Sequence, residues 1–129
     1  GSQYRYHNHD PRPIHVSTIQ SLDHAQLLHG SLFGRESGLD PHAILRIASQ
    51  TYRQRGIGDF LMHMWVAMGC GECAIDSNLA PWDLAPLGLI VTEAGGHVTN
   101  VGRTDFSIHE RTILSSNGHV HSQCEQALK

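Results

Sequence analysis

P-W-D-L-A-P-L-G-L-I-V-T-E-A-G-G, residues 81–96, predicts the helix around which the rest of the chain is organised. Apolar and small residues follow Asp83 almost without interruption, and Gly95-Gly96 supplies a helix stop. A helix of this composition is expected to be buried on most of its sides. Pro86 is tolerated only in the first turn, where its nitrogen has no intrahelical partner to lose, so we expect the helix to begin at Trp82 to Leu84.

Asp83 lies at the head of this helix, and two roles are open to it. At an N-cap or in the first turn, a carboxylate accepts hydrogen bonds from backbone amides that have no partner within the helix. Alternatively, the carboxylate points into a cleft and binds a hard cation such as magnesium. Spacing alone favours the cap.

Three segments of the chain resemble the inositol monophosphatase superfamily, the magnesium-dependent phosphomonoesterases. W-D-L-A (82–85), with an apolar run and E-A-G-G after it, is similar to the family's C-terminal signature. R-Q-R-G-I-G-D-F (53–60), leading into a helix that ends in M-G-C-G, resembles the histidinol-phosphatase branch, and I-L-S-S-N-G-H-V-H (113–121) resembles the closing strand and last helix. One departure is Leu87, which stands where the family usually has a small residue.

The resemblance implies a domain organisation. Residues 14–129 would form the C-terminal α/β domain of a sugar-phosphatase-like fold, and residues 1–13 would be the tail of a preceding domain that this chain lacks. Gly1 and Ser2 are interpreted as the remnant of an expression tag.

The order of predicted elements independently indicates an α/β layered sandwich, in which helices cover the faces of a mixed or parallel sheet. Asp40 and Pro41 open one helix, and Asp59 is expected to cap a second, whose apolar residues would be core. Tyr4–Tyr6 and Ile14–Val16 are expected to pair as a hairpin. The expected strands are 26–30, 54–58, 72–76, 97–101 and 112–116, and the expected helices are 41–48, 60–68, the central helix and a terminal helix after Gly118.

The resemblance also implies roles for four residues. Asp83 would be a magnesium ligand, and Asp76, which ends a predicted buried strand, would contact the non-phosphate part of the substrate. Arg55 and Asp59 match the R-G-x-G-D element of the histidinol-phosphatase branch and would also lie near the substrate. From the residues alone, a strand-end carboxylate in a turn is the favoured interpretation of Asp76, and Asp59 also suits a plain N-cap, a role compatible with a place near the substrate.

Part of the family's metal site has no counterpart in this sequence. The resemblance assigns the other ligands to a glutamate and a D-P-(I/L)-D-G-(T/S) loop in the N-terminal half, and neither occurs here. Asp10-Pro11 is followed by Arg12-Pro13, and Asp40-Pro41 opens a helix. Because one carboxylate does not hold a catalytic magnesium with useful affinity, we expect the chain alone to be inactive.

Composition bounds the remaining function classes. The chain has 129 residues, enough for one domain, and 40% of them are hydrophobic, with no apolar run near 18 residues and no signal-peptide pattern, so we expect no membrane span and a cytoplasmic location. A net charge of −3 with scattered basic residues argues against nucleic acid as a partner. Cys70 and Cys73 are interpreted as reduced thiols, and the eleven histidines as scattered surface residues.

The sequence therefore predicts the C-terminal domain of a phosphatase similar to histidinol-phosphatase, which hydrolyses a small phosphomonoester with Mg²⁺. One alternative is an inositol-phosphate or fructose-1,6-bisphosphate-type phosphatase. Another, of a different class, is a non-catalytic α/β domain for oligomerisation or partner binding. For each of these functions we expect a homodimer, or association through the apolar surface that the absent half would cover.

Overall fold

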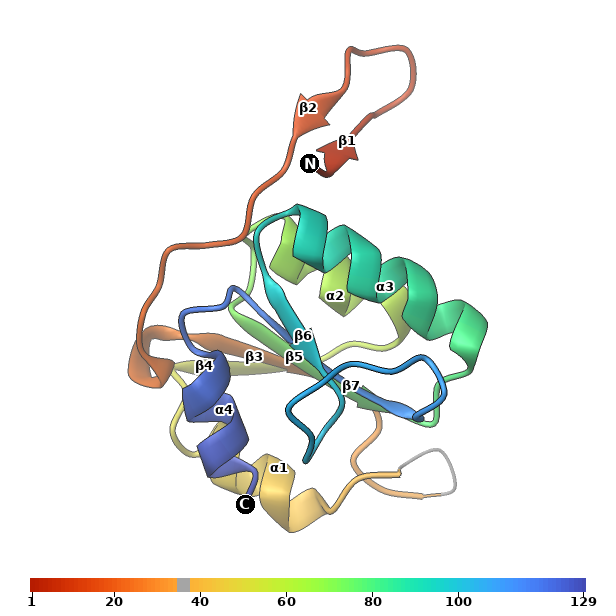
Figure 1. Ribbon diagram of the computed structural model, residues 1–129. Helices are drawn as coiled ribbons and strands as arrows, with labels where there is room; N and C mark the ends of the chain where they lie inside the picture. The colour runs from red at the N-terminus through yellow and green to blue at the C-terminus, as the bar shows by residue number, and fades with distance from the viewer. Residues whose placement is uncertain (35–37) are drawn as a thin grey trace.

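A computed structural model describes residues 1–34 and 38–129 (Figure 1). Its centre is a mixed sheet with the strand order β4-β3-β5-β7-β6. β4, β3 and β5 are parallel, whereas β7 is antiparallel to both of its neighbours. The strands are β3 (Gln26–His29), β4 (Arg53–Gly56), β5 (Cys73–Ser77), β6 (His97–Thr99) and β7 (Thr112–Ser116).

Helices cover both faces of the sheet, which confirms the predicted α/β sandwich (Figure 1). α1 (Pro41–Ala48) and α4 (His121–Ala127) pack on one face, which also holds the short 3-10 helix η1 (Leu22–His24). α2 (Asp59–Ala67) and α3 (Pro81–Glu93) pack on the other face.

Alternation along the strands divides the core into two layers. Leu27 belongs to the cluster under α1 and α4, and Leu28 to the cluster under α2 and α3. In β5, Cys73 and Ile75 face the first layer and Ala74 the second. Successive strand residues point to opposite faces, and complete burial of a leucine contributes about 2 kcal/mol, so both faces stabilise the sheet.

The start of α1 agrees with the prediction from sequence. The Asp40 carboxylate accepts a hydrogen bond from the backbone amide of His42 at 3.0 Å, as an N-cap does. Ile44 and Ile47 are buried against the sheet. Leu45, although it stands between these two residues in the chain, is 54% exposed.

α3 begins earlier than predicted, and this changes the setting of Pro86. Pro81 is the first helical residue, a position that proline favours because its fixed φ suits a helix start. Pro86 therefore lies in the second turn, where it supplies no amide to the carbonyl of Trp82. The expectation that the helix starts at Trp82 to Leu84, with Pro86 in the first turn, was wrong.

The burial of α3 also differs from the prediction. Only one side of the helix is buried, whereas Trp82 is 78% and Leu89 63% exposed. The buried residues of the helix are Leu84, Leu87, Gly88 and Val91. The apolar side chains on the outer side of α3 are therefore left open to solvent, because no other described residue covers them.

The glycine stop of α3 is confirmed. Gly95 has a φ of +90°, a left-handed conformation that glycine adopts at little cost. Its amide donates to the Thr92 carbonyl, and the Gly96 amide donates to the Val91 carbonyl, both at 2.9 Å. This pair of bonds is the Schellman motif, which satisfies the last carbonyls of a helix.

In α2, the predicted cap and core are only partly right. Gly58 is the N-cap residue and makes no side-chain cap bond, while Asp59 is the first helical residue, with a φ of +59°. Asp59 therefore does not cap the helix. Met62 is buried as expected, but Leu61 is 38% exposed, and the buried position beside Met62 belongs to His63.

The N-terminal hairpin forms in a different register from the one predicted. β1 (Gln3–Tyr4) pairs with β2 (Arg12–Pro13), and the hairpin projects from the sandwich (Figure 1). Ile14 continues this pairing, because its amide donates to the Ser2 carbonyl at 3.0 Å, whereas the Val16 amide donates to the carbonyl of Ala94, just after α3, at 3.1 Å. Val16 is thus tied to the α/β body and not to Tyr4–Tyr6.

The sequence also predicts the state of the cysteines and where the histidines lie. Cys70 and Cys73 are free thiols, as expected, and Cys124 is free as well; Cys70 is exposed and the other two are buried. His63 and His121 are buried, so the expectation of surface histidines was wrong at these two positions. In the part of the chain that the structure describes, no helix has the length and apolar character needed to cross a membrane.

Candidate functional site

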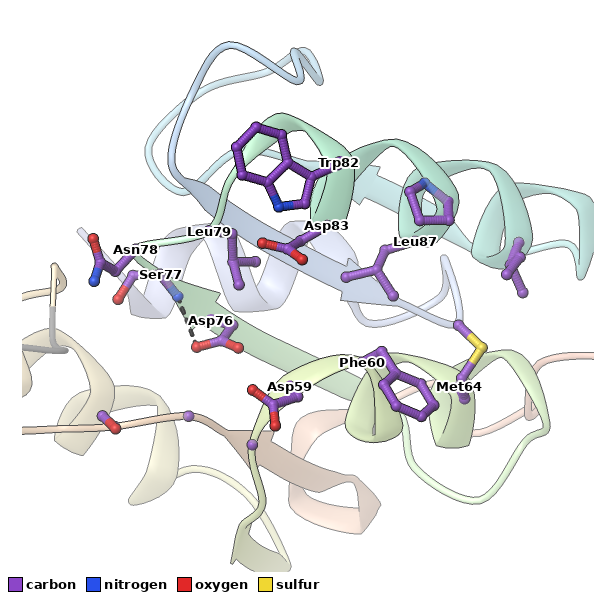
Figure 2. Close-up of a pocket in the computed structure, with 15 residues that line it drawn as sticks. Asp59, Phe60, Met64, Asp76, Ser77, Asn78, Leu79, Trp82, Asp83 and Leu87 are labelled. Carbon is purple, nitrogen blue, oxygen red and sulfur yellow. Dashed lines mark hydrogen bonds between the residues drawn. The ribbon is translucent and has the colours of Figure 1, made fainter.

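A cavity of about 700 Å³ lies at the carboxyl edge of the sheet, between the start of α2 and the start of α3 (Figure 2). The chain leaves β3 toward α1 on one face of the sheet and leaves β5 toward α3 on the other. Where the connections of neighbouring parallel strands part in this way, the carboxyl ends of the strands leave a crevice. Gly30, just after β3, and Asp76, near the end of β5, lie at this crevice.

Asp76 is the most buried acidic group of the cavity, with 8% of the residue exposed. Burial, with smaller contributions from the charges of Asp59 and Asp83, raises the pKa of Asp76 to about 6. The amide of Ser77 opposes this rise by donating to Asp76 Oδ1 at 2.8 Å. Asp76 is thus poised to change its charge near neutral pH, and nearby positive charge would favour the ionised form.

Gly30 makes the room that the Asp76 carboxylate occupies. A Cβ atom on residue 30 would lie 2.1 Å from Asp76 Oδ1, which no side chain can accommodate without movement. The Gly30 amide also donates to the Ile75 carbonyl at 3.1 Å, which holds it beside β5. Sequence reasoning missed this residue, although a glycine directly after a buried strand was the available signal.

Asp83 lies in the first turn of α3, at its third residue, as one of the two readings of the sequence required. Its Oδ2 accepts a hydrogen bond from the Ala80 amide at 3.0 Å, so it satisfies the backbone of the N-cap residue. The side chain is also exposed and lines the cavity. The local structural role and the orientation toward a cleft therefore hold together.

Asp59 lines the cavity from the opposite wall, at the head of α2. Its left-handed backbone is a conformation that aspartate tolerates better than most residues. Figure 2 shows the carboxylates of Asp59, Asp76 and Asp83 directed into the same space from three different elements. The structure thus brings together three of the four predicted site residues.

Arg55, the fourth predicted residue, is not among the residues that line this cavity. It lies on β4, at the edge of the sheet, where its Nη1 donates to the carbonyl of Gln54 at 2.8 Å. The side chain is exposed to solvent. A role for Arg55 at the substrate stays a prediction.

Apolar and aromatic side chains form the rest of the cavity wall. Phe60 and Trp82 are 63% and 78% exposed, and they flank the carboxylates (Figure 2). The other apolar lining residues are Met64, Leu79, Pro86, Leu87 and Ile90. A few polar groups among apolar walls are typical of a small-molecule site.

The donor chemistry of the cavity fits a hard cation, but the donor number does not complete a site. Carboxylate oxygens are the ligands that magnesium prefers. Yet within residues 1–34 and 38–129, no group of three or more His, Cys, Asp or Glu side chains is arranged to hold a metal ion. Asp83, whose exposed carboxylate lines the cavity, can supply part of a coordination shell.

The fold and the acidic cavity at its carboxyl edge define a layered α/β domain of the sugar-phosphatase type, and comparison with known proteins identifies its family. The chain belongs to the inositol monophosphatase family, whose model matches residues 2–129. It is 34% identical over 111 residues to the histidinol-phosphatase of Streptomyces coelicolor, covering 85% of this chain and 41% of that protein. It is 33% identical over 121 residues to an inositol-1-monophosphatase of Synechocystis, covering 91% and 42%.

Solved structures agree with this assignment. The inositol monophosphatase from Anabaena superposes with a TM-score of 0.81 at 30% sequence identity, over 91% of this chain and 48% of that one. The chain therefore spans less than half the length of these relatives.

Proposed function

We propose that this chain is the C-terminal half of a magnesium-dependent phosphomonoesterase similar to histidinol-phosphatase. The observation that carries the proposal is the convergence of Asp76 and Asp83 on one cavity from β5 and α3. The family membership supports it, because relatives named histidinol-phosphatase and inositol-1-monophosphatase match most of the chain.

In the proposed site, Asp83 binds magnesium and Asp76 and Asp59 contact the alcohol part of the substrate. The metal, when bound, activates a water molecule and neutralises the charge that develops on the phosphate. Asp83 suits this role because its exposed carboxylate faces the cavity from the rigid start of a helix. Asp76, buried at the cavity floor, can accept hydrogen bonds from a hydroxyl or an ammonium group of the substrate.

The proposal also explains why the chain alone should be inactive. No group of three or more His, Cys, Asp or Glu side chains among the described residues is arranged to hold a metal ion, whereas in-line displacement with two metals needs both ions fixed. The family resemblance assigns the missing glutamate and D-P-(I/L)-D-G-(T/S) loop to the N-terminal half, and the match covers only 41% of the Streptomyces relative. Activity therefore requires the other half of the protein.

Two substrate classes are consistent with the relatives. The R-Q-R-G-I-G-D-F segment and the identity to the Streptomyces protein favour histidinol phosphate. The Synechocystis relative keeps an inositol phosphate as the alternative. The three carboxylates of the cavity favour the substrate that carries a positive charge, so histidinol phosphate is the first choice.

The test is phosphate release by two proteins. One is the 129-residue chain, and the other is a fusion in which the N-terminal half of the Streptomyces relative precedes residue 2. We expect magnesium-dependent hydrolysis of histidinol phosphate by the fusion, slower hydrolysis of inositol monophosphate, and none by the chain alone. A folded fusion that hydrolyses neither ester would contradict the proposal, and robust hydrolysis by the chain alone would contradict the need for a second half.

A further inference from the structure

The segment between β5 and α3 sets the relative position of the two carboxylates that carry the proposed function. Asp76 lies in β5 and Asp83 in the first turn of α3, and the chain between them leaves the sheet through Asn78. Asn78 has a φ of +62°, a left-handed conformation that asparagine tolerates but does not favour. Such a turn needs contacts from elsewhere to keep one geometry.

Arg111 supplies contacts of this kind from a distant part of the sequence. It directly precedes β7, whose first residue Thr112 pairs with Ser77 at the end of β5. Its Nη2 donates to Asn78 Oδ1, and its carbonyl accepts a hydrogen bond from the Leu79 amide at 3.2 Å. Side chain and backbone of one residue thus hold two consecutive residues of the turn.

The turn is also bonded at both of its ends. The Gly38 amide donates to Ser77 Oγ at 2.9 Å, and the Ala80 amide donates to Asp83 Oδ2 at 3.0 Å. A shift of Asn78 or Leu79 would therefore be transmitted to Ala80, whose amide holds the carboxylate of Asp83.

We propose that Arg111 is a positioning residue, which fixes the Asp83 carboxylate relative to Asp76 by holding Asn78 and Leu79. Arg111 does not line the cavity, so it acts through the turn and does not contact the substrate. Its consequence for catalysis rests on the function proposed above. Its consequence for the turn does not.

The first experiment uses the 129-residue chain and needs no activity. In Arg111→Ala we expect amide hydrogen exchange at Leu79 and Ala80 to become about tenfold faster, as for the loss of one charged hydrogen bond, and the Ala80 amide resonance to shift. Exchange at Ile75, inside β5, should stay unchanged. Arg103→Ala is the matched control, because Arg103 lies in the same β6–β7 connection but pairs with Asp105 and Glu110 on the surface.

Two further variants separate this contact from a general loss of stability. Arg111→Lys keeps a donor on a long side chain and should restore part of the protection at Leu79. Asn78→Gly removes the acceptor while glycine still adopts the left-handed turn. In that background, Arg111→Ala should accelerate exchange less than twofold. Unchanged exchange at Leu79 in Arg111→Ala, or an equal effect of Arg103→Ala, overturns the proposal.

The catalytic readout uses the active fusion described above. Misplacement of a metal ligand affects the chemical step more than substrate binding, so Arg111→Ala should lower kcat about tenfold and change KM less than twofold. Faster exchange at Leu79 with unchanged kcat overturns the positioning role. If the unsubstituted fusion is inactive, the proposed function fails, and the Ala80 resonance still decides whether Arg111 holds Asp83 in place.

Discussion

The two helical layers of the sandwich differ in their outer surfaces. On the layer of α1 and α4, Leu45 is the one large apolar residue of a helix that is exposed among the described residues. On the layer of α2 and α3, the exposed large apolar residues are Phe60, Leu61, Met68, Trp82 and Leu89. The layer of α1 and α4 thus exposes little apolar surface to solvent. The layer of α2 and α3 is apolar both toward the sheet and toward solvent, as is typical of helices that pack between two other layers.

The two layers also differ in how completely the ring nitrogens of their buried histidines are hydrogen-bonded. His121, in α4, has a hydroxyl partner for each ring nitrogen, Thr99 at 3.0 Å and Ser116 at 2.8 Å. His63, in α2, is bonded to Ser115 at 2.7 Å through Nδ1, but its buried Nε2 has no hydrogen-bond partner among the described residues. The layer of α2 and α3, which also carries the cavity, thus contains a buried ring nitrogen without a hydrogen-bond partner among the described residues, whereas both ring nitrogens of His121 are bonded.

The largest expected effect concerns the exposed face of α3. We expect the 129-residue chain to self-associate at tens of micromolar, because an apolar surface of this kind is normally covered. Trp82→Lys combined with Leu89→Lys should weaken association about 100-fold, about 3 kcal/mol. Sedimentation equilibrium measures this, with Leu45→Lys on α1 as the control that leaves association unchanged. A clean monomer of the unsubstituted chain would show that the two layers do not differ in this respect.

The next effect concerns His63 in acid. Burial lowers the pKa of His63 to about 3, from about 6.5 in the unfolded chain. Above pH 6.5, His63 is neutral in both states and does not reduce the free energy of unfolding. As the pH falls below 6.5, protonation of His63 in the unfolded chain lowers this free energy, by about 2–3 kcal/mol at pH 4.5. His63→Leu should abolish this part of the loss between pH 7 and 4.5 in urea unfolding. His42→Leu, at an exposed position of α1, should behave like the unsubstituted chain, and equal acid sensitivity of all three would refute the assignment.

A smaller effect of opposite sign is expected at Asp76. Because the folded pKa of about 6 lies above the unfolded value of 3.8, ionisation of Asp76 costs stability as the pH rises from about 4 through 6. The full shift corresponds to about 3 kcal/mol, and solvent in the cavity reduces it to about 1–2 kcal/mol. Asp76→Asn should thus stabilise the chain at pH 7.5 and have little effect at pH 4. Thermal unfolding at the two pH values measures this, and a loss of stability at pH 7.5 would count against the burial argument.

The smallest stability effect is expected at Asp83. Its bond to the Ala80 amide closes one side of a capping box, so Asp83→Ala should cost about 0.5–1 kcal/mol. Asp83→Asn keeps an acceptor and loses only the interaction of a negative charge with the helix dipole, a few tenths of a kcal/mol. Urea unfolding of the two variants checks this prediction. A larger loss of stability in Asp83→Asn than in Asp83→Ala would contradict it.

Much of the fold could be predicted from local signals. The glycine stop after α3, the Asp40 cap of α1 and the order of strands and helices all depend on residues close together in the chain. The start of α3 was misplaced because Pro86 was taken as the proline of the first turn. Pro81 already filled that position.

The site was predictable only where its residues carry a local motif. Asp76 lies near the end of a recognisable strand and Asp59 and Asp83 at recognisable helix starts, and the structure brings the three together. Gly30 carries only a weak signal, a glycine directly after a buried strand, and Arg111 carries none, because each acts on a residue far along the sequence. Contacts of this kind arise from the packing of β3, β5 and β7 side by side, which no short motif encodes.

The most direct test of the central claim, that the cavity of the second layer is half of a phosphatase site, is magnesium-dependent phosphate release by the active fusion carrying Asp83→Asn. An amide is a poor magnesium ligand but still accepts the Ala80 bond. We predict a loss of at least about 100-fold in kcat at saturating magnesium, with an unfolding midpoint close to that of the unsubstituted fusion. Asp40→Asn, which changes the cap of α1 on the other layer, should leave turnover unchanged. Near-normal turnover of the Asp83→Asn fusion would contradict the account, because Asp83 would then serve only the start of α3.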